Sequence, residues 1–570
     1  MKKLLVIFLI LAALAVAATV AGILLSDGAG PSLGGPTVLV WRVEGPVPEQ
    51  RQPDFLGLSS HSRTGSVAEL YRGFRAARED ASVEGLALYI RDTGFGLAKA
   101  QEFRRQLRAV AASGKFVECY FETVGEGSNG TLAYYLASAC DHIYLAPAGA
   151  VNLLGLYADA LFLRGTLEKL KVEPEFLSIG EFKSAGEIFT RTEHSPAARE
   201  AIEAVLDGEL RQIVEAVAEA RGLAPEEVVR LIDVAPHTAE QALAAGLVDG
   251  LLYPDEFRDR VEELAGGEPR LVHLDAFGQR GRLSGRRIAV VFAAGTIIRG
   301  AGGLEPWTEE LFVGSDDLSR LLRDLAENRS VAAVVLRIDS PGGSALASDL
   351  ILREVELLSQ GKPVVVSMSD LAASGGYYIA AKADKIVAEP GTITGSIGVV
   401  MGRFATSELE REHLGVTRDP IARGANAGLW SDPAPLAAEE RAILEAQMAE
   451  IYRSFVGHVA AGREMTPEAV ERVARGRVWL GSDAARLGLV DELGGIDRAV
   501  ELAAEAAGLP ADQPVRLAYY PEPKSWIEVL LDARRPLLPA TLRRLAVGLA
   551  PVVRGALHAP PEVRELAAPF

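Results

Sequence analysis

The sequence predicts an α/β protein built from two tandem copies of one domain, each with a parallel sheet and covering helices. The chain has 570 residues, too many for one ordinary hydrophobic core, and two domains with extensions fit this length. Four patches of sequence recur at offsets of 242 to 247 residues, which indicates a duplicated domain and not a solenoid. Apolar runs rich in β-branched residues alternate with helical patterns, as in folds with parallel strands.

The recurring patches define how the two copies align. Residues 92–96 match 339–343, 134–137 match 377–380, 147–155 match 390–398, and 246–249 match 488–491. We therefore expect an anchor at 1–27, a first repeat at 28–280, a second repeat at 281–509 and a C-terminal extension at 510–570. The polar segment 266–286, rich in Gly and Arg, is the expected linker between the repeats.

The N-terminus carries a membrane signal. Residues 4–25 contain no charge and follow Lys2 and Lys3, and a helix of this length spans a bilayer core of about 30 Å. The apolar stretch is longer than that of a cleavable signal, so an uncleaved transmembrane helix is favoured, with cleavage near Ala18 or Ala21 as the alternative. The two lysines place the remainder of the chain outside the cytoplasm.

Charge and cysteine content narrow the function classes. The net charge of −18 argues against binding of nucleic acid, which requires clustered cations. Cys119 and Cys140 are the two cysteines of the chain. An exported location permits a disulfide between them, but two separate buried thiols are the favoured interpretation.

The strands and helices of the second repeat follow in order. Residues 331–338 are apolar apart from Arg337, as expected of a strand buried on both faces. The expected elements of this repeat are strands at 288–292, 331–338 and 364–367, and helices at 345–359, 375–383, 435–459 and 466–474. The last helix has Thr466 as its N-cap and Pro467 at its first position. The first repeat is expected to open with a strand at 38–43. The tail after Leu509 is expected to pack as an extension of the core, with partner helices or a contact with the membrane surface as the alternatives.

Ser374 is the candidate nucleophile. It follows a buried strand and precedes a helix, so its hydroxyl should lie at the carboxyl edge of the sheet. A serine attacks only when a neighbouring base removes its proton. Gly375 can offer a backbone N–H to the developing oxyanion, and Gly343, in the turn after the neighbouring strand, is the preferred second donor.

The base is expected to be a lysine. His413 lies in a charged stretch typical of an exposed helix face, and His458 is the other histidine between Ser374 and residue 557. Among the eleven lysines, Lys382 and Lys385 lie too far along the following helix and Lys362 precedes its strand. Lys183, in a Gly-flanked segment of the first repeat, is the favoured base, with a surface lysine as the alternative. It requires burial that lowers its pKa by several units.

Four motifs together resemble the signal peptide peptidase A family, also called protease IV, in its long, duplicated form. The motifs are 340–343, 373–376, 394–398 and 182–185, and the resemblance covers roughly residues 36 to 530. It implies tandem domains of the Clp protease/crotonase-like fold and a membrane-anchored serine endopeptidase that degrades remnant signal peptides. It also implies Ser374 as nucleophile, Lys183 as base, Ser396 as the residue that orients the lysine, and Gly343 with Gly375 as the oxyanion hole.

The resemblance further implies a homotetramer with apolar substrate grooves, held by its anchor in the inner membrane of a bacterium, with the catalytic part on the periplasmic side. No metal and no cofactor are expected. The first repeat has Thr131, Leu132 and Ala133 where the second has Ser374 and two glycines, so one composite site per chain is predicted. The alternatives are a non-catalytic membrane scaffold of degenerate repeats and a crotonase-like acyl-CoA enzyme.

Overall fold

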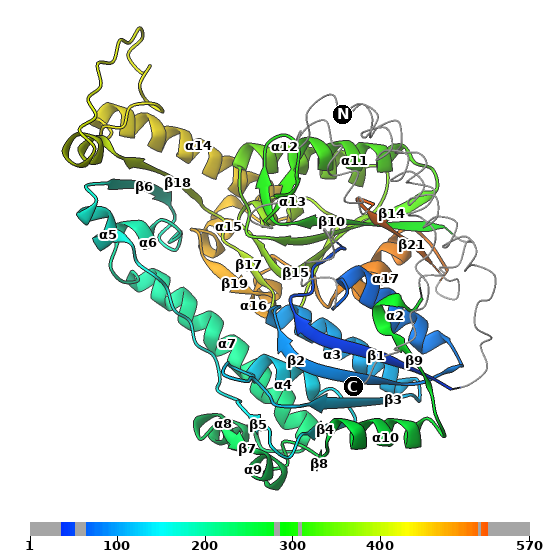
Figure 1. Ribbon diagram of the computed structural model, residues 1–570. Helices are drawn as coiled ribbons and strands as arrows, with labels where there is room; N and C mark the ends of the chain where they lie inside the picture. Colours follow the sequence, from blue (N-terminus) through cyan, green and yellow to red (C-terminus); the bar gives the residue numbers. More distant parts are fainter. Residues whose placement is uncertain (1–35, 52–63, 279–285, 306–309, 511–514, 523–570) are drawn as a thin grey trace, which may run out of the picture.

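The computed structural model describes residues 36–51, 64–278, 286–305, 310–510 and 515–522. Two stacked sheets with covering helices form its body (Figure 1). The prediction of an α/β fold with parallel sheets is confirmed. The anchor predicted at 4–25 lies outside the described residues, and within these ranges no helix is long and apolar enough to cross a membrane.

The first sheet consists of six parallel strands. In spatial order they are β8 (Gly250–Leu251), β4 (His142–Leu145), β3 (Phe116–Phe121), β2 (Val83–Thr93), β1 (Thr37–Gly45) and β9 (Arg270–His273). The edge strand β9 lies inside the segment that the sequence suggested as a linker.

The second sheet repeats this arrangement. In order it contains β19 (Val478–Leu480), β17 (Ile393–Gly395), β15 (Val364–Ala373), β14 (Val331–Ser340), β10 (Arg287–Ala294) and β21 (Arg516–Tyr520), with β16 (Lys385–Ala388) beside β15 and β20 (Glu492–Leu493) beside β16. All these pairs are parallel except β17 with β19. The edge strand β21 follows Leu509 and is the counterpart of β9.

The helices cover both sheets and the space between them. Those of the first half are α2 (Val67–Glu79), α3 (Leu97–Ala112), α4 (Thr131–Ala137), α5 (Arg164–Lys169), α6 (Glu187–Thr190), α7 (Pro196–Arg221), α8 (Pro225–Asp233), α9 (Ala239–Ala244) and α10 (Pro254–Leu264). Those of the second half are α11 (Ser315–Glu327), α12 (Ala345–Ser359), α13 (Gly375–Ala380), α14 (Ala438–Gly462), α15 (Pro467–Val473), α16 (Gly481–Arg486) and α17 (Ile496–Ala506).

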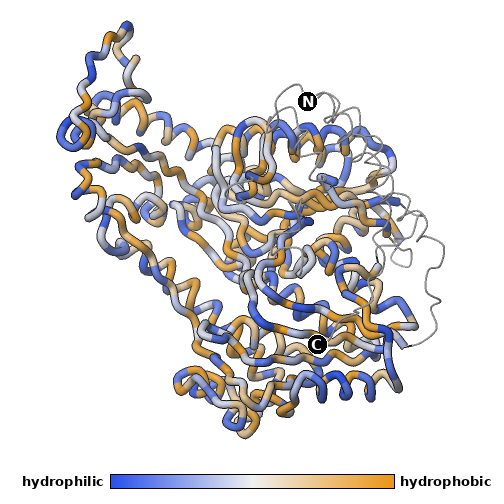
Figure 2. The backbone as a smooth tube through the Cα atoms, viewed as in Figure 1, coloured by the Kyte–Doolittle hydropathy of each residue, from blue (hydrophilic) through white to orange (hydrophobic). Residues whose placement is uncertain are grey.

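Local sequence explains the long helices. Ser195 caps α7 by accepting a hydrogen bond from Ala198 N, and Pro196 fits the first helical position. Gly222 ends α7 in the left-handed conformation, at φ 65°. Hydrophobic residues lie along many of the strands, whereas hydrophobic and hydrophilic residues alternate along the outer helices (Figure 2).

Matched patches of the two repeats make the same contacts. The Tyr134 hydroxyl donates to Leu247 O (2.7 Å), and the Tyr377 hydroxyl donates to Leu489 O (2.8 Å). Each repeat also has its own buried core. The equivalent contacts support a duplicated domain.

The cysteine expectation is wrong. Cys119 and Cys140 form a disulfide, with their Cα atoms 6.0 Å apart. Cys119 lies on β3 and Cys140 lies just before β4, the neighbouring parallel strand, so the return of the chain after α4 brings the two side chains together. Spacing along the sequence carried no sign of this pairing.

A two-stranded ribbon joins the repeats away from the sheets. The strand β6 (Glu173–Ile179) of the first repeat pairs antiparallel with β18 (Val399–Ala405) of the second. Figure 1 shows the ribbon projecting from the body, with α14 beside it. It carries the segment after β6 to the edge of the second sheet.

Candidate active site

Ser374 stands at the carboxyl end of β15, directly before α13. Its backbone has φ 55° and ψ −117°, a conformation that a non-glycine residue rarely adopts. The Ser374 N–H donates to Gly395 O (2.9 Å), which holds this turn against the neighbouring strand β17. The sharp turn presents the hydroxyl at the sheet edge, where the sequence placed it.

Lys183 reaches Ser374 from the other repeat. The Lys183 Nζ lies 3.0 Å from Ser374 Oγ, 2.9 Å from Ser396 Oγ and 2.8 Å from Ser396 O. Lys183 and Ser374 are 191 positions apart in sequence. The structure thus brings together the predicted nucleophile, base and orienting residue.

Two glycines allow the first repeat to approach so closely. A Cβ on Gly180 would lie 2.2 Å from the carbonyl carbon of Arg475, and a Cβ on Gly476 would lie 2.5 Å from Lys183 N. Phe182 N also donates to Arg475 O (3.0 Å). Sequence reasoning did not single out Gly476, because an isolated glycine does not indicate which distant strand approaches it.

Burial sets the protonation of Lys183. Its side chain is buried, and burial lowers the pKa of the ammonium from 10.5 to about 8. No carboxylate among the described residues forms an ion pair with it. Roughly half of Lys183 is therefore neutral at about pH 8, in the form that a general base requires.

We expect peptide hydrolysis to rise with pH through about 8. The neutral amine is the form that accepts a proton, and its fraction increases as pH passes the pKa of Lys183. The measurement is kcat/KM for an uncharged peptide between about pH 4 and 10. A profile that is maximal below about pH 5 would contradict a lysine base.

The two predicted oxyanion donors lie side by side. A Cβ on Gly375 would be 3.1 Å from Gly343 N, so the two peptide groups are adjacent. Gly343 has φ 150°, and a Cβ there would lie 2.1 Å from Ile297 O. Both positions leave room for a substrate carbonyl because neither carries a side chain.

The other candidate bases are exposed or contact other residues. His413 is exposed on the short helix Leu409–His413, and His458 Nε2 lies 3.1 Å from Asp349 Oδ1. The remaining lysines considered have partners of their own: Lys362 bonds Leu325 O and Asn328 O, Lys382 pairs with Glu356, and Lys385 pairs with Asp491.

The position in the first repeat that is equivalent to Ser374 is Thr131. Thr131 is buried, and its Oγ1 accepts a hydrogen bond from Gly155 N (2.9 Å).

Within the described part of the chain, no group of three or more His, Cys, Asp and Glu side chains could hold a metal ion. The expected absence of a metal and of a cofactor stays a prediction.

Known proteins resemble most of this chain. Residues 120–268 and 356–510 match peptidase family S49. A chloroplastic serine protease SPPA of Arabidopsis thaliana is 35% identical over 87% of this chain and 73% of its own length. Protease 4 of Salmonella typhi is 33% identical over 90% of this chain and 83% of its own length. Protease 4 of Haemophilus influenzae is 33% identical over 79% of this chain and 74% of its own length.

Solved structures resemble it more weakly. A mutant of ClpP1 from Listeria monocytogenes is 15% identical, over 37% of this chain and 94% of that chain, with a TM-score of 0.24. A score this low does not decide the fold family. The Clp protease/crotonase-like assignment therefore stays a prediction.

Proposed function

The chain belongs to peptidase family S49 and is a serine peptidase, and from this premise we propose that Ser374 and Lys183 form its catalytic dyad. The observation that carries the proposal is the set of three short contacts of the Lys183 Nζ. A neutral amine has two N–H groups and one lone pair. The two N–H groups match Ser396 O and Ser396 Oγ, and the lone pair is left to face the Ser374 hydroxyl.

The reaction then follows from this geometry. Lys183 takes the proton of Ser374 as Oγ attacks the peptide carbonyl, and the N–H groups of Gly343 and Gly375 stabilise the oxyanion. The protonated lysine donates to the leaving amine, which departs and leaves an ester on Ser374. A water molecule, deprotonated by Lys183, attacks this ester and releases the second product with Ser374 restored.

We propose that the substrates are released signal peptides and other unfolded apolar peptides. A relative from Enterococcus faecium, named as a putative signal peptide peptidase SppA, is 37% identical over 30% of this chain and 50% of its own length. An extended peptide can pair with a strand edge while its side chains enter pockets.

The substrate proposal predicts a preference for Leu, Ala or other apolar residues before the cut. A library of unfolded peptides with one varied position measures it, with a folded protein containing the preferred sequence as the control. Preference for Lys, Arg or Asp at that position would contradict the proposal, and labelling of Ser374 by a serine-reactive phosphonate would still report on the dyad.

We also propose that the uncharged stretch at 4–25 anchors the protein in the inner membrane of a bacterium, with the catalytic part on the periplasmic side. The uncharged stretch after Lys2 and Lys3 supports this, and so does the Cys119–Cys140 disulfide, since such bonds persist in oxidising compartments. Protease added to cells with an opened outer envelope should digest the chain. Complete protection would contradict the proposal.

A homotetramer is proposed on the symmetry of the two repeats. The strand β18 of the second repeat pairs with β6 of the first. Matched positions of the two repeats are 243 residues apart, as 147 and 390 are. The counterpart of β18 in the first repeat is therefore 156–162, and the counterpart of β6 in the second repeat is 416–422. Neither segment forms a strand here. Tyr157 and Ile421, one in each segment, are both 84% exposed.

The helix α12 supports the same arrangement. Its counterpart α3 is buried against the second repeat, where Arg105 bonds Glu389 and Asp497. On α12, Leu346 and Leu350 are 51% and 45% exposed. A second copy that covers these sites by the contacts already used within the chain would join head to tail and close into a ring. Light scattering should give the mass of four chains, and a monomer would contradict this.

A further inference from the structure

The strand that carries Ser374 is interrupted by a bulge shortly before the serine. In the pairing of β14 with β15, Ile338 lies opposite Met368, but the next pair is Ser340 with Ala372. Two residues of β14 thus span four of β15, and the bulge re-aims the end of the strand. The position of Ser374 therefore depends on the contacts that fix the bulge in place.

The first repeat holds this bulge through the N-terminus of α3. The Asp370 carboxylate, at the centre of the bulge, accepts hydrogen bonds from Gly96 N (2.8 Å) and Lys99 N (2.8 Å). The N-cap residue of α3 is Gly96, which has no side chain to satisfy these N–H groups. A carboxylate of the second repeat thus caps a helix of the first.

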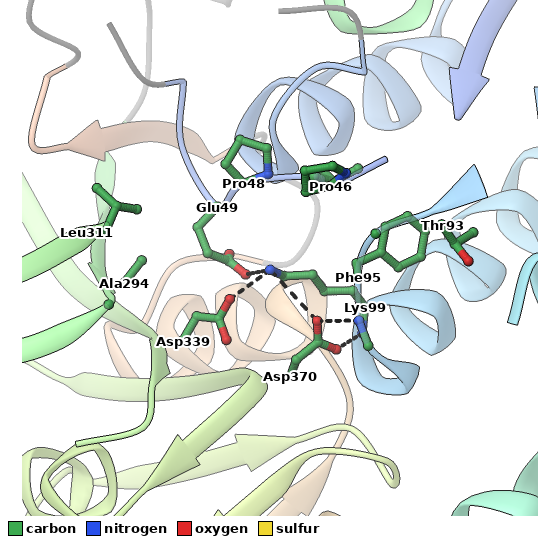
Figure 3. A pocket seen from close by; sticks show the side chains of 14 residues that line it. Pro46, Pro48, Glu49, Thr93, Phe95, Lys99, Ala294, Leu311, Asp339 and Asp370 are labelled. Atoms are coloured by element: carbon green, nitrogen blue, oxygen red, sulfur yellow. Dashed lines mark hydrogen bonds and ion pairs between the residues drawn. The ribbon is translucent and has the colours of Figure 1, made fainter. Parts of the chain in front are cut away.

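The ammonium group of Lys99 joins the same cluster (Figure 3). Its Nζ lies 2.7 Å from Asp339 Oδ2, 3.2 Å from Glu49 Oε1 and 3.8 Å from Asp370 Oδ2, and its side chain is only 8% exposed. These groups line a cavity of about 590 Å³ between the repeats. Three carboxylates thus converge on one buried cation.

Asp339 connects Lys99 to residues 340–343, the turn that carries Gly343 and is called the oxyanion turn here. It directly precedes Ser340, whose hydroxyl accepts from Gly342 N (3.1 Å), and its own Oδ1 accepts from Leu371 N in the bulge (3.3 Å). Lys99 therefore touches the residue before the oxyanion turn and the bulge before the nucleophile, but not the reacting atoms.

The pKa values of the two buried lysines of the first repeat, Lys99 and Lys183, are shifted in opposite directions. Burial would lower the pKa of Lys99, but the carboxylates of Asp339, Glu49 and Asp370 raise it well above its ordinary value. Lys183 has no such partner, and burial lowers its pKa to about 8. Lys99 therefore stays charged at pH values where Lys183 is neutral.

We propose that Lys99 is a positioning residue of the peptidase, which holds the ends of β14 and β15, and with them the oxyanion turn and Ser374, in catalytic alignment. The inference rests on the proposed dyad. It gives the first repeat a second task besides supplying Lys183. A displacement of about 1 Å in such an alignment lowers turnover by ~100-fold.

The test is the Lys99→Met variant, which keeps side-chain length and removes the charge. We expect kcat to fall by ~100-fold while KM changes by less than about threefold, because Lys99 acts on the alignment of the reacting groups through Asp339 and the bulge. Labelling of Ser374 by a phosphonate should slow in parallel. Lys99→Arg, which keeps a cation for Asp339, should recover to within about tenfold of the parent. The matched control, Lys385→Met, removes a half-exposed lysine and should change kcat by less than about twofold.

Folding is controlled by a second variant. Lys99→Met leaves buried carboxylates without their cation, so Lys99→Met/Asp339→Asn removes one of these charges while the positioning contact stays absent. If at least one of these two variants is folded, a ~100-fold loss of kcat in that variant supports the proposal. A kcat within about threefold of the parent overturns it. If neither folds, Lys99 serves folding and the proposal is overturned as well. Ser374→Ala tests the dyad separately, so the two ideas fail independently.

Discussion

Substitution of Ser374 by alanine should lower kcat/KM for an apolar peptide by ~10⁴-fold or more, because no other group can form the acyl intermediate. The half-buried hydroxyl contributes one hydrogen bond, to Lys183, so the free energy of unfolding should change by no more than about 1 kcal/mol. Peptide hydrolysis and thermal unfolding, measured on the same preparation, check both expectations. Activity within about twofold of the parent would remove Ser374 from the mechanism.

Thr131→Ala is the matched control in the other repeat. Thr131 occupies the position equivalent to Ser374, but its hydroxyl accepts a hydrogen bond from Gly155 N inside the first repeat. We expect activity within about twofold of the parent and a loss of about 1 kcal/mol in stability. Strong loss of activity in a folded Thr131→Ala protein would show that the first repeat has a catalytic role beyond Lys183.

Substitution of Lys183 by methionine should lower kcat/KM by a similar ~10⁴-fold and should abolish the rise of activity through about pH 8. Methionine fills the space of the lysine stem but cannot accept the Ser374 proton. The pH profile separates this effect from general damage, because a weakened enzyme that retained its base would keep the rise at lower amplitude. A variant that keeps both its rate and its profile would exclude Lys183 as the base.

The proposed dyad lies within one chain, and mixed assemblies test this. Lys183 Nζ and Ser374 Oγ are 3.0 Å apart in the same chain. Co-expressed Ser374→Ala and Lys183→Met chains should therefore recover no activity, since neither contains a complete dyad. Recovery of a substantial fraction of activity would place the dyad between chains and leave the Ser/Lys chemistry standing.

Local patterns predicted many of the elements and the candidate nucleophile. The helix predicted at 345–359 is α12 as observed, and the strand predicted at 331–338 is the body of β14. Ser374 could be found because strand, turn and helix follow one another within a few residues, and chain stereochemistry then places the side chain at the sheet edge. Lys183 could be found because lysines are few and the repeat had already suggested a shared site.

Contacts between the repeats could not be predicted in this way. Arg337 was visible as the one charge in an apolar strand, but its partners Glu49 and Glu102 lie 288 and 235 positions away. The Lys99 cluster and the approach of Gly476 to Lys183 are of the same kind. Spacing along a chain encodes periodicity and turns, because these depend on neighbouring residues. The packing of the two folded repeats against each other decides which buried charges come into contact. The burial that lowers the pKa of Lys183 exists only after that packing.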